Sequence, residues 1–121
     1  MLTNNEDLEW LVRKAGLFCG EMVFPVVYAP ECHFFEYNSL VADFKNSVKN
    51  RDNAQTSCAG LFVGANLKDG FEFDGRWCHL DFCAPSSMYG YERGTGYPVA
   101  LMVSVLSKVA DFKADFNFSD Y

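Results

Sequence analysis

The polar and apolar side chains alternate along residues 76 to 84, which read Arg-Trp-Cys-His-Leu-Asp-Phe-Cys-Ala. A period of two places neighbouring side chains on opposite faces of an extended strand. Four side chains then share one face: Trp77, His79, Asp81 and Cys83. A turn-rich loop follows, and Pro98 opens a stretch with helical periodicity, where its fixed φ suits a first turn. We therefore predict a central strand over 76–84 and, with the helix after it, an α/β fold.

Two stretches at the ends of the chain have the three- and four-residue spacing of amphipathic helices. The first spans residues 6 to 19, with a capping box at residues 3–6 and a left-handed stop at Gly20. Its apolar face is formed by Leu8, Leu11, Val12, Ala15 and Phe18. The second follows Pro98, and its apolar stripe is formed by Val99, Met102, Val103, Leu106 and Ala110. Both are predicted helices.

The middle of the chain has weaker periodicity. Residues 21 to 38 are rich in Phe, Tyr and Pro, and Pro25 and Pro30 lack an amide donor, so we predict a loop with a short edge strand at most. Helical spacing then returns at Tyr37, Leu40, Val41, Phe44 and Val48. The basic and amide residues between 45 and 53 are interpreted as a solvated loop, because the chain as a whole is acidic.

Residues 57 to 67 form a predicted helix of small side chains, in which Gly60 and Gly64 lie one turn apart on the same face. Two glycines cost such a helix about 2 kcal/mol relative to alanine. A compensating interaction is therefore expected. We predict close packing of the backbone of this helix against another element.

The composition indicates one folded domain. Half of the 121 residues are apolar, which is enough to bury a core, and the net charge of −6 opposes binding to nucleic acid and to anionic membranes. No apolar run reaches the roughly 20 residues needed to span a bilayer, and residues 1–7 lack the features of a secretory signal. The five cysteines are odd in number and scattered, which favours reduced thiols in the cytoplasm.

His79, Asp81 and Cys83 carry side chains that bind metals and share a strand face. Residues two apart on a strand are nearly 7 Å apart, so a tetrahedral site needs further ligands from elsewhere, and none stands at ligand spacing. The residues alone leave two interpretations open. The histidine and aspartate are hydrogen-bonded structural residues, or the three residues form part of a metal or thiol site.

The amino-acid sequence of several segments resembles that of leucyl aminopeptidases of the M17, or cytosol aminopeptidase, family. Residues 77–85 (WCHLDFCAP) and 92–101 (ERGTGYPVAL) are similar to the closing motif of that family. Residues 39–46 (SLVADFKN) and 57–62 (SCAGLF) are similar to two earlier family segments, in the same order. Residues 25–28 and 51–53 look closest to the probable aminopeptidase-like branch of animals.

This resemblance implies a partial three-layer α/β/α unit with a mostly buried mixed sheet. Residues 1–110 would be the C-terminal portion of a larger catalytic domain, followed by an acidic aromatic tail at 111–121. In the family, two divalent ions, zinc or manganese, activate a bridging water that attacks the first peptide bond. The motifs that carry the metal ligands and the catalytic arginine are absent here. We therefore expect the chain to begin after them, to contain no catalytic or metal residue of its own, and to be inactive alone.

The resemblance also implies roles for particular residues. Cys83 and Ser86 would line the pocket for the first side chain of the substrate, while His79 and Asp81 would be structural residues of the neighbouring strand. The intact enzyme would be a cytoplasmic hexamer that cleaves N-terminal residues from peptides. Two alternatives remain: a non-catalytic structural or assembly module, and an unrelated α/β protein that binds metal or thiol ligands.

Overall fold

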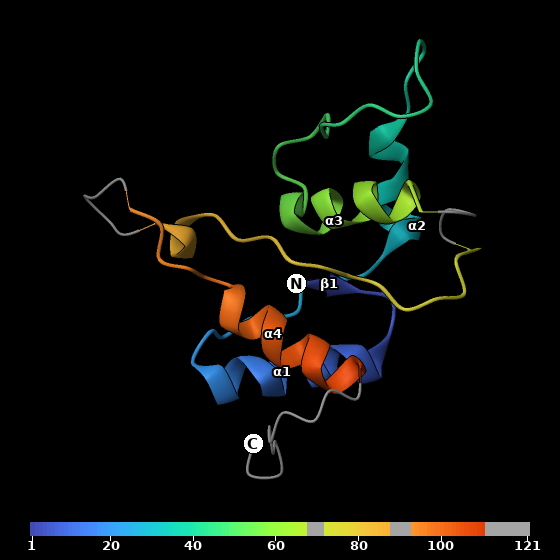
Figure 1. Cartoon of the computed structure of the whole chain (residues 1–121). Helices are drawn as coiled ribbons and strands as arrows, with labels where there is room; N and C mark the ends of the chain where they lie inside the picture. Colours follow the sequence, from blue (N-terminus) through green and yellow to red (C-terminus); the bar gives the residue numbers. More distant parts are fainter. Residues whose placement is uncertain (68–71, 88–92, 111–121) are drawn as a thin grey trace. The chain divides into compact units, whose positions relative to one another are not determined.

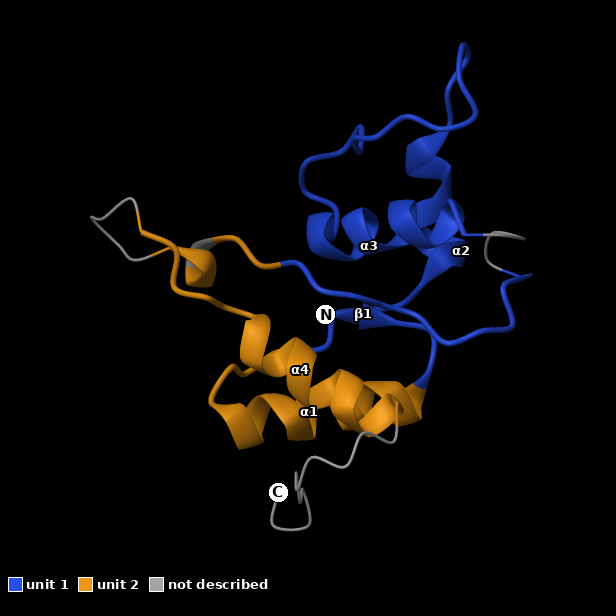
Figure 2. Cartoon of the chain, in the orientation of Figure 1, with its two compact units in different colours: residues 1–5, 25–81 blue, residues 6–24, 82–121 orange. Residues whose placement is uncertain are grey.

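The computed structural model describes residues 1–67, 72–87 and 93–110, so the tail expected at 111–121 lies outside the described residues. The chain divides into two compact units (Figure 2). Unit 1 comprises residues 1–5 and 25–81, and unit 2 comprises residues 6–24 and 82–121. The elements are labelled in Figure 1. No helix of the described residues is both long and apolar enough to cross a membrane.

Unit 1 contains a small antiparallel sheet of two strands, β1 (Leu2–Thr3) and β2 (Cys78–His79). Leu2 lies opposite His79, and Thr3 lies opposite Cys78. The combination of helices and sheet confirms the α/β class, but β2 is much shorter than the strand expected over 76–84. At the N-terminal end of β2 the reason lies in the side chain of Asn4, which accepts a hydrogen bond from the Trp77 amide at 3.1 Å and donates one to the Gly75 carbonyl at 2.9 Å. A side chain takes the place that a longer partner strand would fill.

Thr3 shows why the expected capping box at residues 3–6 is wrong. Its hydroxyl donates to the Trp77 carbonyl at 2.6 Å and accepts the amide proton of Asn5 at 3.2 Å. Thr3 therefore belongs to β1 and its contact with β2, while the first helix begins only at Glu6.

Helix α3 (Gln55–Ala65) confirms the close packing predicted from its two glycines. A Cβ built on Gly60 would lie 2.6 Å from Leu2 Cδ2 and 3.2 Å from His79 Cδ2. A Cβ on Gly64 would lie 2.6 Å from Trp77 Cζ2. The side chains of β1 and of the segment around β2 thus lie directly on the backbone of α3, and this contact offsets the poor helix propensity of glycine.

The segment between 30 and 54 differs from the prediction. Helix α2 (Pro30–His33) begins at a proline in its first turn, and the 3₁₀ helix η1 (Phe34–Tyr37) follows it, so the loop expected over 21–38 is wrong there. No helix forms over residues 38–54. Tyr37 is pulled into the core, where its hydroxyl donates to the Cys58 carbonyl, and its own carbonyl accepts the amide proton of Lys45 at 2.9 Å. These tertiary contacts outweigh the helical spacing of the apolar residues.

Unit 2 is a pair of packed helices, α1 (Glu6–Cys19) and α4 (Val99–Val109), as the periodicity predicts. Gly20 has φ of +78°, which confirms the left-handed stop after α1. The segment after it holds the start of α4. A Glu21 carboxylate oxygen accepts the amide proton of Leu101 at 2.7 Å, and the Tyr97 hydroxyl donates to the Met22 carbonyl at 3.1 Å. A negative side chain at a helix N-terminus is favourable for the helix dipole.

The apolar stripe predicted for α4 is largely exposed. Its members Val99, Met102, Val103 and Leu106 and the neighbouring Val109 are between 43% and 64% exposed, and these five side chains form the α4 stripe. The buried residues of α4 are Leu101 and Ser104, and the Ser104 hydroxyl donates to the Ala100 carbonyl at 2.8 Å. The predicted stripe is therefore present, but its side chains are exposed among the described residues.

Candidate functional site

His79 lies at the end of β2 in unit 1, where it is half-buried. It packs beside Gly60 and borders a mostly apolar cavity of about 380 Å³, which Tyr37 and Cys58 also line. Burial lowers the pKa of the imidazole, and the nearby Asp81 carboxylate opposes this effect. Asp81 itself is exposed. His79 is therefore a packed residue of the contact between the sheet and α3.

Cys83 and Ser86 lie in unit 2, around the short 3₁₀ helix η3 (Ala84–Ser86). The Cys83 carbonyl accepts both the Ser86 hydroxyl proton at 2.5 Å and the Ser86 amide proton at 3.3 Å. Thr95 then holds the turn from the other side. Its amide donates to the Ser86 carbonyl at 3.0 Å, and its hydroxyl donates to the Pro85 carbonyl at 2.6 Å. The hydrogen bonds of Ser86 and Thr95 fix the turn, while the Cys83 side chain is exposed.

The four predicted residues therefore fall in two different units. In residues 1–67, 72–87 and 93–110, no group of three or more His, Cys, Asp or Glu side chains is arranged to hold a metal ion. The described residues do not fit a metal centre.

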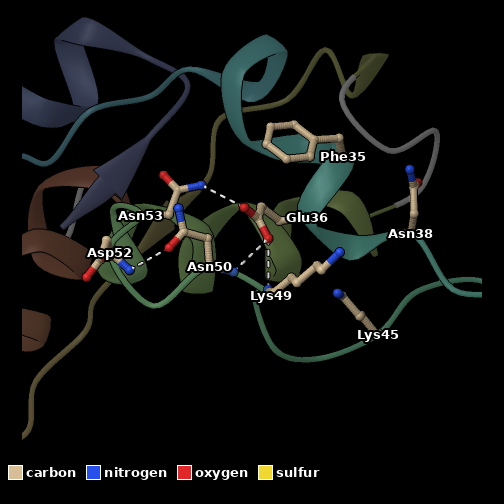
Figure 3. Close-up of a pocket in the computed structure, with 8 residues that line it drawn as sticks. All are labelled: Phe35, Glu36, Asn38, Lys45, Lys49, Asn50, Asp52 and Asn53. Carbon is tan, nitrogen blue, oxygen red and sulfur yellow. Dashed lines mark hydrogen bonds between the residues drawn. The ribbon is translucent and has the colours of Figure 1, made fainter.

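A second cavity, of about 890 Å³, surrounds Glu36 in unit 1 (Figure 3). Glu36 is only 3% exposed. Its carboxylate accepts three hydrogen bonds, from the Lys49 amide at 2.8 Å, the Asn50 amide at 3.4 Å and the Asn53 side-chain amide at 3.1 Å. These bonds, led by the Lys49 amide, hold the pKa of Glu36 below its ordinary value. The sequence analysis missed this residue.

The cavity around Glu36 is best explained as a loop anchor. The groups that donate hydrogen bonds to Glu36 belong to the chain itself, so both of its carboxylate oxygens already have hydrogen-bond partners. Two basic side chains, Lys45 and Lys49, line the same cavity as two acidic ones, Glu36 and Asp52, and their formal charges cancel. This arrangement selects neither an anion nor a cation. The sequence signal was a single acid among the aromatic residues 34–37, ahead of a loop rich in amides.

Comparison with known proteins defines the class. The catalytic domain of the cytosol aminopeptidase family, peptidase family M17, matches residues 1–103. The chain belongs to this family of metallopeptidases, which confirms the resemblance and excludes the unrelated metal- or thiol-binding protein.

Individual relatives place it more closely. The chain is 46% identical over 111 residues to the probable aminopeptidase NPEPL1 of Homo sapiens, covering 92% of this chain and 20% of that protein. It is 42% identical over 108 residues to leucine aminopeptidase 1 of Caenorhabditis elegans, covering 88% and 21%. Among solved structures, the apo leucyl aminopeptidase of Trypanosoma cruzi has a TM-score of 0.78 at 41% identity, covering 87% of this chain and 20% of that one. The chain thus spans about a fifth of the length of these relatives.

Proposed function

We propose that residues 1–110 are the C-terminal portion of an M17 catalytic domain, whose intact form removes N-terminal residues from peptides. The observation that carries this proposal is the family match over residues 1–103, together with aminopeptidase relatives about five times as long as the segment they share. We further propose that the intact protein is a cytoplasmic hexamer with two divalent ions, zinc or manganese. The ligands of these ions would lie in the larger part of the domain.

The role proposed for this chain is that of scaffold and pocket wall. The contact of α3 with β1 and β2 fixes the segment that carries His79 and Asp81. The turn after it presents Cys83 and Ser86, which we propose as the wall of the pocket for the first side chain of the substrate. Two features support this assignment: the Cys83 thiol is exposed, and hydrogen bonds of Thr95 hold the backbone beneath it. A wall of this kind sets the size of the side chain that fits.

A chimera tests the proposed function. The segment of C. elegans leucine aminopeptidase 1 that matches this chain would be replaced by this chain, and hydrolysis of a leucyl reporter would be measured with manganese or zinc. We expect the chimera to be active and the chain alone to be inactive. An inactive chimera that still folds, or metal-dependent hydrolysis by the chain alone, would contradict the proposal.

The pocket assignment has its own test in the active chimera. We expect Cys83→Trp to lower kcat/KM for a leucyl reporter about tenfold more than for an alanyl reporter, because a large ring leaves less room for a bulky side chain. Cys32→Trp is the matched control, since Cys32 is also an exposed thiol but lies in α2 of unit 1. Equal losses for both reporters would remove Cys83 from the pocket.

A further inference from the structure

Helix α4 has one buried side and one exposed apolar side. Leu101 is fully buried, while Val103 and Leu106 are each more than half exposed. With about 3.6 residues per turn, the stripe that contains Val103 and Leu106 lies opposite Leu101 and Ser104. An amphipathic helix normally packs its apolar stripe against another element. Among the described residues, the stripe of α4 is instead the exposed side.

The exposed stripe is one continuous surface. Its five side chains lie one to three residues apart along the helix and share one face: Val99, Met102, Val103, Leu106 and Val109. Soluble proteins rarely expose a contiguous apolar patch of this kind unless something binds there. The stripe is therefore a candidate docking surface, and the remaining question is what covers it.

A second copy of the chain is a poor occupant. An 11-residue helix is about 16 Å long, so a stripe along it offers on the order of a few hundred Å². Stable dimers bury about 800 Å² per partner. The relatives suggest a better occupant, since they share only about 20% of their length with this chain. The first residues of α4 lie inside the matched catalytic-domain segment, so α4 is an element that this chain shares with the family.

We propose that the α4 stripe binds the polypeptide that forms the rest of an M17 catalytic domain, as one part of a larger apolar contact. This inference rests on the proposed function, but it concerns binding and not hydrolysis. It predicts that the chain can associate with that polypeptide even when the two are supplied separately. The apolar side chains of the stripe then leave water, and a charge introduced among them would have to be buried.

The first test uses the full 121-residue chain with an affinity tag, co-expressed with C. elegans leucine aminopeptidase 1 from which the matching segment has been removed. We expect the two polypeptides to purify together, and Val103→Asp to reduce the recovered partner at least about tenfold. Ala100→Asp is the matched control. It adds the same charge to the same helix at an exposed position outside the stripe, near the N-terminus where an acidic group is tolerated, and it should reduce recovery less than about twofold.

Two results would overturn the proposal: equal recovery with Val103→Asp and the wild type, or a dimer of the chain alone that Val103→Asp dissociates. Because the shortened partner could fail to fold, the same two exchanges are also made at the matching positions of intact C. elegans leucine aminopeptidase 1, whose structure is solved. The stripe exchange should lower its Tm by several degrees and the control should not. Equal Tm values would overturn the proposal, whereas co-purification without leucyl hydrolysis would uphold it and contradict the proposed function.

Discussion

Helices α3 and α4 each contain 11 residues and both are rich in apolar side chains, yet this chain buries them to very different degrees. Six residues of α3 are buried, and they include both glycines and Cys58. In α4 the buried residues are Leu101 and Ser104. The difference shows that α3 has most of its packing partners within the described part of the chain, whereas α4 has only some of them.

The side chains explain this difference. Gly60 and Gly64 allow Leu2, His79 and Trp77 to approach the backbone of α3, so its small face is matched by partners from the same unit. The stripe of α4 carries larger side chains, and no element in residues 1–67, 72–87 and 93–110 covers them. The small-residue face of α3 is covered within unit 1 and is called its closed face, whereas the stripe of larger side chains on α4 is exposed. Each side of this comparison can be tested by substitution.

The largest effect is expected at the covered side of α4. Leu101→Ala should lower the free energy of unfolding of unit 2 by about 3 kcal/mol, because it leaves a cavity at a fully buried position. Leu106→Ala, on the same helix at 56% exposure, should change it by less than about 0.5 kcal/mol.

Denaturation followed by the fluorescence of Trp10 measures this pair, with Trp77 replaced by phenylalanine so that only α1 reports. Equal losses at the two leucines would mean that the stripe is already covered within the chain. In that case the contrast between α3 and α4 would fail.

A slightly smaller effect is expected at the closed face of α3. Gly60→Val should destabilise unit 1 by about 2 kcal/mol, since its Cβ alone would come within 2.6 Å of Leu2 Cδ2. Ala59→Val is the control, because Ala59 is the exposed neighbour on the same helix and should tolerate the change within about 0.5 kcal/mol. Trp77, which packs on the adjacent turn, reports the unfolding in a Trp10→Phe background. A stabilised Gly60→Val would show that the close contact is not needed.

The same comparison separates what the sequence predicts from what it does not. Periodicity over residues 6–19 and after Pro98 predicts both helices of unit 2, because their turns satisfy local hydrogen bonds. The glycine pair predicts close packing of α3, since its propensity cost needs compensation. The packing partner of α4 is not predicted, because the apolar spacing of the α4 stripe does not indicate which polypeptide segment covers it.

Non-local polar contacts account for the remaining errors. The carboxylate of Glu36 binds the amides of Lys49 and Asn50, 13 and 14 residues further on, and these bonds hold a loop where apolar spacing predicts a helix. The Asn4 side chain shortens β2 from more than 70 residues away. Among the candidate site residues, the sequence and its family resemblance name Cys83 and Ser86, but the anchoring of their turn by Thr95 depends on contacts that only folding brings together.

The smallest expected effect is a pH dependence confined to unit 1. His79 contacts α3, and burial lowers its pKa below the ordinary value of 6.5, while Asp81 opposes this shift and the amino group of Met1 adds to it. The unfolded chain therefore takes up a proton at a higher pH than the folded chain. Stability should be constant above about pH 6.5 and decrease as the pH falls below it toward the folded pKa.

His79→Gln should flatten this dependence, and Asp81→Asn should steepen it, because the carboxylate that favours the protonated imidazole is then missing. Denaturation curves between pH 5 and 7.5, again followed at Trp77, measure the slope. Unit 2 is the internal control, since Leu101 and Ser104 do not titrate and Trp10 should report no such slope from the α4 contact. If His79→Gln kept the slope of the wild type, the imidazole would not be the group that couples the closed face of α3 to pH.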